Sequence, residues 1–83
     1  MYQLLSLFIS FIFTEPFNMV LKNNLKELRQ EKNYTQEELG INVGVSRQTI
    51  ISIERYRYNP SLELAMKIAN NLNVKIEKLF YFS

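Results

Sequence analysis

The chain of 83 residues has room for one small domain, and it contains no cysteine, no histidine and only two glycines. This composition excludes cysteine nucleophiles, zinc sites built from cysteine and histidine, histidine-dependent triads and glycine-rich phosphate loops. We therefore expect the chain to be no enzyme and to hold no metal and no cofactor. A formal net charge of +2 permits nucleic acid as a partner without proving it.

The first twenty residues form an apolar extension with one charge, Glu15. The uncharged run over residues 2–14 is shorter than the roughly 20 residues that cross a bilayer, and no basic segment precedes it as in a secretory signal. Three interpretations stay open. We favour an upstream stretch that is not natively translated, with the start near Met19. A partner-binding or self-associating arm comes next, and membrane contact through residues 1–17 is the least favoured.

After this extension, the spacing of apolar residues predicts short helices joined by tight turns. The first helix, of about ten residues, is expected to bury Leu25, Leu28 and the stem of Lys32. Asn33 is expected to end it.

Two further helices follow with a very short connection. Residues 35–38 read TQEE, a capping box that starts the second helix, and Gly44 stands where a left-handed residue would end it. Ser46 can cap a third helix over residues 47–55. Two short helices joined by about three residues around a glycine are typical of a helix-turn-helix.

The remaining chain predicts two more helices. Asn59 or Ser61 can cap the fourth, and the residues expected to face inward on it are Leu64, Ala65, Ile68, Ala69 and Leu72. Ile76, Leu79 and Phe80 indicate a short fifth helix, and no segment shows the alternation of a strand. The prediction is an all-α, five-helix single domain over residues 21–83.

Longer stretches of the sequence carry a family resemblance. Residues 35–54 read TQEELGINVGVSRQTIISIE, residues 58–69 read YNPSLELAMKIA, and NV at 73–74 precedes IEKLF at 76–80. Over residues 22–80 the chain resembles the phage-repressor/Cro-type, or XRE-like, helix-turn-helix family. The resemblance implies a lambda-repressor-like fold and sequence-specific binding to a double-stranded DNA operator. It also implies a homodimer that regulates transcription, most often as a repressor.

The third helix has the side chains that this function requires. Ile50 and Ile53 share a face that must be buried, and the opposite face is polar. In the major groove glutamine can pair with adenine, arginine with guanine, and serine with either base. The resemblance implies base contacts for Arg47, Gln48 and Ser52. It implies phosphate contacts for Gln36, Thr49, Arg55, Arg57 and Tyr58. Taken alone, the same polar residues would also fit an ordinary solvated helix face.

Other residues are expected to hold the fold: Arg29, Glu54, Thr35, Gly44 and Ser46. Glu54 lies on the buried side of the third helix, where a lone carboxylate is costly, and the resemblance pairs it with Arg29 in a salt bridge. Gly40 replaces the family's usual alanine, so Gly40→Ala is expected to be neutral or stabilising by up to about 1 kcal/mol. Tyr56 tolerates a left-handed backbone poorly, so the turn after the third helix is expected to differ from the family's.

A DNA-binding transcriptional regulator in the cytoplasm is the favoured function. One alternative is an antitoxin-like or other protein-interaction module on the same fold. Another is a membrane-tethered regulator that uses residues 1–17 as its anchor. Salt-dependent binding to duplex DNA separates the favoured function from a pure interaction module.

A chain beginning at Met19 is expected to fold, to bind the same DNA and to be more soluble than the full chain. The apolar positions from Leu25 onward suffice for a core, whereas an exposed apolar extension promotes aggregation. Circular dichroism melts and DNA titrations of the two chains check this. Loss of folding or of DNA binding on truncation would show that residues 1–18 belong to the fold or to a dimer interface.

Overall fold

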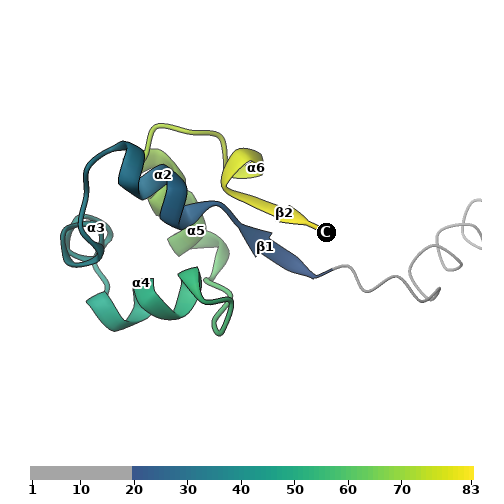
Figure 1. Ribbon diagram of the computed structural model, residues 1–83, viewed down its shortest axis with the longest axis horizontal. Coiled ribbons are helices and arrows are strands. Elements are labelled where there is room, and N and C mark those ends of the chain that lie inside the picture. The colour runs from purple at the N-terminus through teal and green to yellow at the C-terminus, as the bar shows by residue number, and fades with distance from the viewer. Residues whose placement is uncertain (1–19) are drawn as a thin grey trace, which may run out of the picture.

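The computed structural model describes residues 20–83, so the predictions made for the apolar extension at residues 1–19 lie outside the described residues. The elements in chain order are β1 (Leu21–Asn23), α2 (Leu25–Glu31), α3 (Gln36–Val43), α4 (Arg47–Glu54), α5 (Leu62–Asn71), α6 (Ile76–Leu79) and β2 (Phe80–Phe82). Figure 1 shows α3 and α4 at one end of the domain and the two strands at the other. The five predicted helices are therefore confirmed in the described part of the chain.

The helices enclose one apolar core. α3 packs against both α4 and α5, and α6 packs against α5. The fully buried large side chains are Leu25, Leu39, Ile50, Ile53, Ile68, Leu72 and Leu79. Burial of each such side chain contributes roughly 1.5–3 kcal/mol. The positions predicted to face inward on α5 are all buried, but Lys32 is exposed because α2 ends at Glu31.

Side-chain caps set the starts of three helices, as the sequence predicts. At α3 the Thr35 hydroxyl accepts the Glu38 N–H at 3.0 Å, and the Glu38 carboxylate accepts the Thr35 N–H at 2.8 Å. Ser46 accepts the Thr49 N–H at 3.2 Å, and Ser61 likewise caps α5. These bonds satisfy amide donors that a helix start leaves unpaired.

The all-α prediction missed a small antiparallel sheet. Leu21 pairs with Phe82, Lys22 with Tyr81 and Asn23 with Phe80. Phe80 was predicted within the last helix, but it has the extended backbone of β2. Each strand has only three residues, and its partner lies at the far end of the described sequence, so local periodicity gives no signal for the sheet.

Buried Asn23 joins this sheet to the helices. Its side-chain NH₂ donates to the Ile53 carbonyl in the last turn of α4 at 3.0 Å, and its side-chain oxygen accepts the Leu25 N–H at 3.0 Å. The Tyr56 hydroxyl donates to the Asn23 carbonyl at 3.3 Å. Tyr56 has a φ of 60°, so it adopts the left-handed conformation that a tyrosine was expected to avoid. Its bond to β1 offsets part of that strain.

The turn that precedes α4 lies directly against Gly40 of α3. The Val45 N–H donates to the Gly40 carbonyl at 2.9 Å. A Cβ atom at Gly40 would lie 2.7 Å from the Val45 carbonyl oxygen and 3.3 Å from the Ser46 carbonyl carbon. The expectation that Gly40→Ala would be neutral or stabilising is therefore wrong, because the methyl group meets backbone that it must displace.

Gly40→Ala is expected to lower the free energy of unfolding by about 1–3 kcal/mol, the usual range for overpacking. Urea denaturation followed by circular dichroism measures this. Ile41→Ala is the matched control, since Ile41 is the next residue of α3 and 71% exposed. The control should stay within about 0.5 kcal/mol of the parent. A Gly40→Ala protein as stable as the control would contradict the close approach.

Candidate nucleic-acid interface

The turn of residues 44–46 fixes α4 on α3. Gly44 ends α3 with a φ of 81°, the left-handed conformation predicted for it. The hydroxyls of Ser46 and Thr49 lie 3.0 Å apart, so both side chains belong to the cap of α4. With Gly40 allowing close approach, α3 and α4 form a tightly packed helix-turn-helix unit.

One side of α4 is buried and the other faces solvent. Ile50 and Ile53 have no exposed surface, as predicted. Arg47 and Gln48 are exposed, and Ser52 is half-buried at the edge of the same outer side. The three residues predicted to read bases therefore lie along the accessible side of this helix.

A hollow of about 280 Å³ joins the outer side of α4 to the loop that follows it. The Arg57 N–H donates to the Ser52 carbonyl at 2.9 Å, which folds the loop back along α4. The hollow is lined by Ser46, Gln48, Thr49, Ser52, Arg57 and Tyr58. Two predicted base contacts and three predicted phosphate contacts thus share one concave surface. Arg55 is exposed at the end of α4 but does not line this hollow.

Gln36, the remaining predicted phosphate contact, lies in a second hollow of about 430 Å³. This hollow lies between the starts of α3 and α4 and is lined by Arg29, Thr35, Gln36, Glu37 and Arg47. The Gln36 side-chain NH₂ donates to a carboxylate oxygen of Glu54 at 3.1 Å. Sequence reasoning missed this bond, because nothing in the local sequence of Gln36 points to a residue on a different helix.

Arg29 and Glu54 form the predicted ion pair. Arg29 Nε lies 2.7 Å from Glu54 Oε2, and Nη2 lies 3.3 Å from Oε1. Arg29 Nη1 donates to the Tyr34 carbonyl at 2.8 Å. The two side chains are only 9% and 5% exposed, and within residues 20–83 every buried side-chain nitrogen or oxygen has a partner. The pair is thus fully hydrogen-bonded, which a buried ion pair requires.

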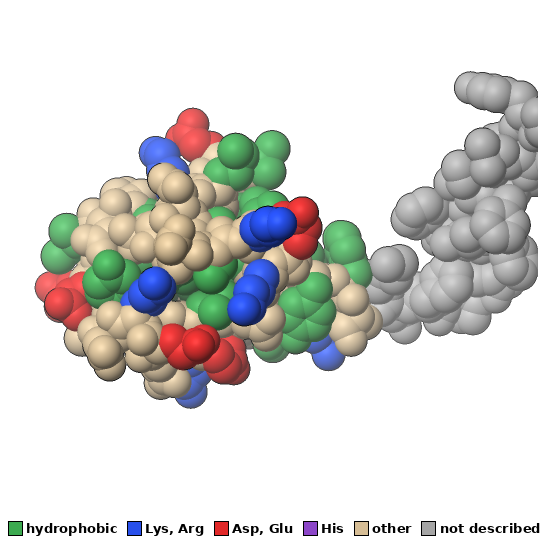
Figure 2. Space-filling view, turned by 90° about the horizontal axis from the view of Figure 1, so that it is seen from above, with side chains coloured by type: hydrophobic (Ala, Val, Ile, Leu, Met, Phe, Trp, Pro, Cys, Tyr) green, Lys and Arg blue, Asp and Glu red, His purple; other side chains and the backbone are tan. Residues whose placement is uncertain are grey.

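Charge is distributed differently over the two sides of the domain. The face seen in Figure 2, viewed from above Figure 1 and away from α4, mixes acidic and basic side chains. α4 and its following loop carry Arg47, Arg55 and Arg57, and their acidic residue, Glu54, is paired with Arg29. α4 and the loop that follows it are therefore basic, although the whole chain is only weakly so.

Metal sites and membrane-spanning helices have no support among residues 20–83. No group of three or more acidic, histidine or cysteine side chains could hold a metal ion there. In the same part of the chain, no helix is long and apolar enough to cross a membrane.

Known proteins share this arrangement. Residues 25–79 match the family model described as helix-turn-helix. The chain belongs to the XRE-like helix-turn-helix family. An uncharacterized helix-turn-helix transcriptional regulator of Methanocaldococcus jannaschii is 55% identical over 62 residues, which are 75% of this chain and 94% of that protein. The immunity repressor of Bacillus phage phi105 is 33% identical over 61 residues, which are 74% of this chain and 42% of the repressor.

Solved structures of the family have the same fold. The restriction-modification controller protein C.AhdI of Aeromonas hydrophila superposes with a TM-score of 0.62 at 33% identity, over 65% of this chain and 82% of that one. The clp gene regulator ClgR of Corynebacterium glutamicum superposes with a TM-score of 0.61 at 29% identity, over 63% of this chain and 55% of that one. The family resemblance predicted from the helix-turn-helix and its flanks is therefore confirmed.

Removal of either partner of the Arg29–Glu54 pair, by Arg29→Met or Glu54→Gln, should destabilise the domain by roughly 3–5 kcal/mol. The reason is that the remaining charge stays buried without its partner. Urea denaturation of both single variants and the double variant gives the coupling free energy. Independent, additive effects in that cycle would show that the two side chains do not interact.

Proposed function

We propose that this protein binds double-stranded DNA sequence-specifically through α4 in the major groove and represses transcription. The observation that carries the proposal is the shared hollow, in which groove-reading side chains of α4 adjoin a basic loop. A helix-turn-helix inserts the N-terminal part of its second helix into the groove, and here that part holds exposed Arg47 and Gln48. A phage repressor and transcriptional regulators among its relatives support the same role.

Base readout is assigned to Arg47, Gln48 and Ser52. Arginine can form two hydrogen bonds with guanine and glutamine two with adenine, whereas serine can form a hydrogen bond with either base. Arg47 also lines the hollow at the start of α3, so its long side chain can reach either a base or the adjacent backbone. Ser52, being half-buried, can only contact a base that comes close to the helix.

The phosphate contacts are assigned to residues on both sides of the groove-reading helix: Gln36, Thr49, Arg55, Arg57 and Tyr58. On one side, the first amides of α3 and the Gln36 side chain can bind a phosphate, since a helix start favours anions. The Glu54 carboxylate holds the Gln36 NH₂ by one hydrogen bond, which leaves its second N–H free for that contact. On the other side, Arg57 and Tyr58 are assigned to phosphates of the DNA strand that the loop faces.

We propose further that the protein acts as a homodimer on a two-fold symmetric operator, without a cofactor, in the cytoplasm. Two copies of α4 would then read two half-sites about one helical turn, or 34–36 Å, apart. Selection of bound sites from random duplexes tests this part of the proposal. It should yield inverted repeats with fixed spacing, and recovery of no enriched sequence would contradict specific readout.

Gln48→Ala is expected to weaken binding to the selected site by about 1–3 kcal/mol and to relax preference at one base position per half-site. Arg57→Ala should instead weaken binding to all duplexes alike and reduce the slope of log K against log salt by about one. Titrations at several salt concentrations, with matched and mismatched duplexes, distinguish the two effects.

Lys78→Ala provides the control for charge, because Lys78 is exposed on α6 and outside both hollows. It should leave sequence preference and salt slope close to the parent values. Unchanged base preference in the Gln48→Ala protein would remove this residue from the readout.

A further inference from the structure

One apolar side chain lies among the polar residues on the outer side of α4. Ile51 is half-buried, whereas Ile50 and Ile53 of the same helix have no exposed surface. At 100° per residue, Ile51 points roughly 130° away from the mean direction of those two buried isoleucines. Its side chain therefore lies on the side of α4 that faces away from the core.

The core of the domain does not account for this isoleucine. Within residues 20–83, the partly buried apolar side chains that pack against the core are Tyr34, Val45, Val74, Ile76 and Phe80, and Ile51 is not one of them. A β-branched residue is also a poorer helix former than alanine or glutamine. Neither packing within the described part of the chain nor helix propensity therefore explains an isoleucine at this position.

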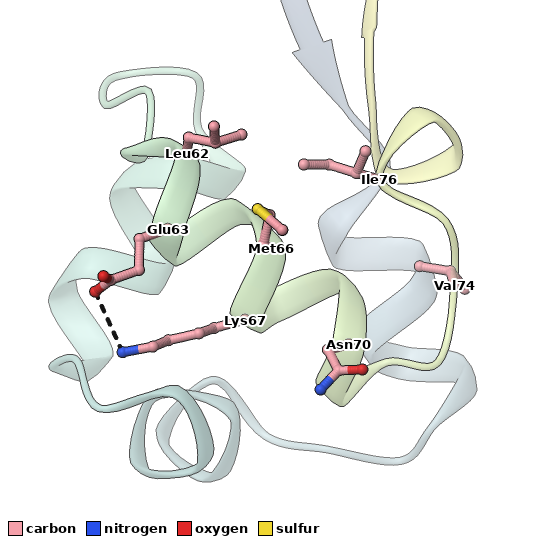
Figure 3. A pocket seen from close by; sticks show the side chains of 7 residues that line it. All are labelled: Leu62, Glu63, Met66, Lys67, Asn70, Val74 and Ile76. Atoms are coloured by element: carbon pink, nitrogen blue, oxygen red, sulfur yellow. Dashed lines mark ion pairs between the residues drawn. The ribbon is translucent and has the colours of Figure 1, made fainter.

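Other exposed apolar side chains of the domain belong to a separate surface. Leu62 and Met66 of α5 are 70% and 56% exposed, and they border a groove of about 720 Å³ whose other wall carries Val74 and Ile76 (Figure 3). Among the described residues, none that lines this groove belongs to α4. Ile51, by contrast, lies within the proposed DNA site.

The neighbours of Ile51 along α4 are residues assigned to DNA. Arg47 precedes it by four residues and Arg55 follows it by four, so the three side chains form one stripe along the helix. Both arginines are exposed. Gln48 and Ser52, which are assigned to base readout, form the adjoining stripe. A helix that turns these side chains toward the bases also brings Ile51 to a base edge.

We propose that Ile51 reads the 5-methyl group of a thymine in each half-site. The inference deepens the proposed function and rests on it, because it requires α4 to lie in the major groove. Each base presents hydrogen-bonding groups in that groove, and thymine alone of the four adds a methyl group. Because the isoleucine side chain has neither donor nor acceptor, the methyl group is the part of the groove that it contacts favourably.

The same contact selects against the other bases. Over adenine, guanine or cytosine, the apolar side chain would separate a donor or acceptor of the base from water without replacing its hydrogen bond. Arg47 and Gln48 read guanine and adenine by hydrogen bonds, so neither supplies this preference. Ile51 favours thymine both by contact with the methyl group and by the cost of covering any other base.

Replacement of thymine by uracil tests the contact, because it removes the methyl group and leaves the hydrogen-bonding groups of the base unchanged. Thymines of the selected site are replaced one at a time, and dissociation constants are measured by titration with the full 83-residue chain. At one thymine per half-site, uracil should weaken binding by about three- to fivefold, the factor expected for burial of one methyl group. The Ile51→Ala protein should bind the thymine and uracil duplexes equally at that position.

Two variants serve as controls. Ile51→Val keeps a branched apolar side chain, so it should remain sensitive to uracil at the same position. Ile41→Ala removes an isoleucine that is 71% exposed on α3 and lines neither hollow beside α4. It should distinguish the two duplexes as the parent does. Circular dichroism verifies that each variant is folded.

Methylation of cytosine provides a second test that does not depend on any variant. When the sensitive thymine–adenine pair is replaced by a cytosine–guanine pair, 5-methylation of that cytosine restores the methyl group at the same place in the groove. The parent should bind the methylated duplex about three- to fivefold more tightly than the unmethylated one. The Ile51→Ala protein should not distinguish them.

Three results would overturn the inference. These are a parent whose affinity is unchanged by uracil at every thymine, an Ile51→Ala protein that keeps the parent's sensitivity, and a parent that does not distinguish methylated from unmethylated cytosine. Each of them leaves the proposed DNA binding intact, because it is measured on a site that the protein selects. Recovery of no enriched sequence in the selection would instead reject the proposed function and this inference together.

Discussion

The buried carboxylate of Glu54 is the point on which the arrangement of the helices depends. It belongs to α4, accepts two hydrogen bonds from Arg29 of α2, and accepts a third from Gln36 at the start of α3. A buried charge is tolerated only when its partners surround it, and here they come from two other helices. Packing of α2, α3 and α4 is therefore coupled to one side chain. The orientation of α4, and so which of its residues face outward, follows from that coupling.

Asn23 has a comparable role in the two-stranded sheet, where the beginning and the end of the described sequence pair. Its side chain bonds the last turn of α4 and the first turn of α2, while its backbone pairs with β2. The last turn of α4 is thus fixed by Asn23 and Glu54, and its first turn by the Ser46 cap. In the proposed complex with DNA, a helix whose backbone is already fixed at both ends loses less conformational entropy on binding.

The sequence by itself determined the features that act over a few residues. The capping box at Thr35, the left-handed end of α3 at Gly44 and the cap at Ser46 each involve neighbours within one helical turn, so their residue types suffice to predict them. Apolar spacing likewise gave the buried sides of α4 and α5. The ion pair of Arg29 with Glu54 required the family resemblance, since the two residues lie on different helices.

Only the tertiary structure decided the features that depend on distances between elements. The strands pair residues 21–23 with residues 80–82, which are far apart in the sequence, and neither strand has a recognisable pattern of its own. Gly40 lacks room for a methyl group because the backbone of the following turn lies against it. The left-handed Tyr56 and the bond from Gln36 to Glu54 likewise require partners brought close by folding. Local propensity contains no information about those separations, because they are set by how the whole core packs.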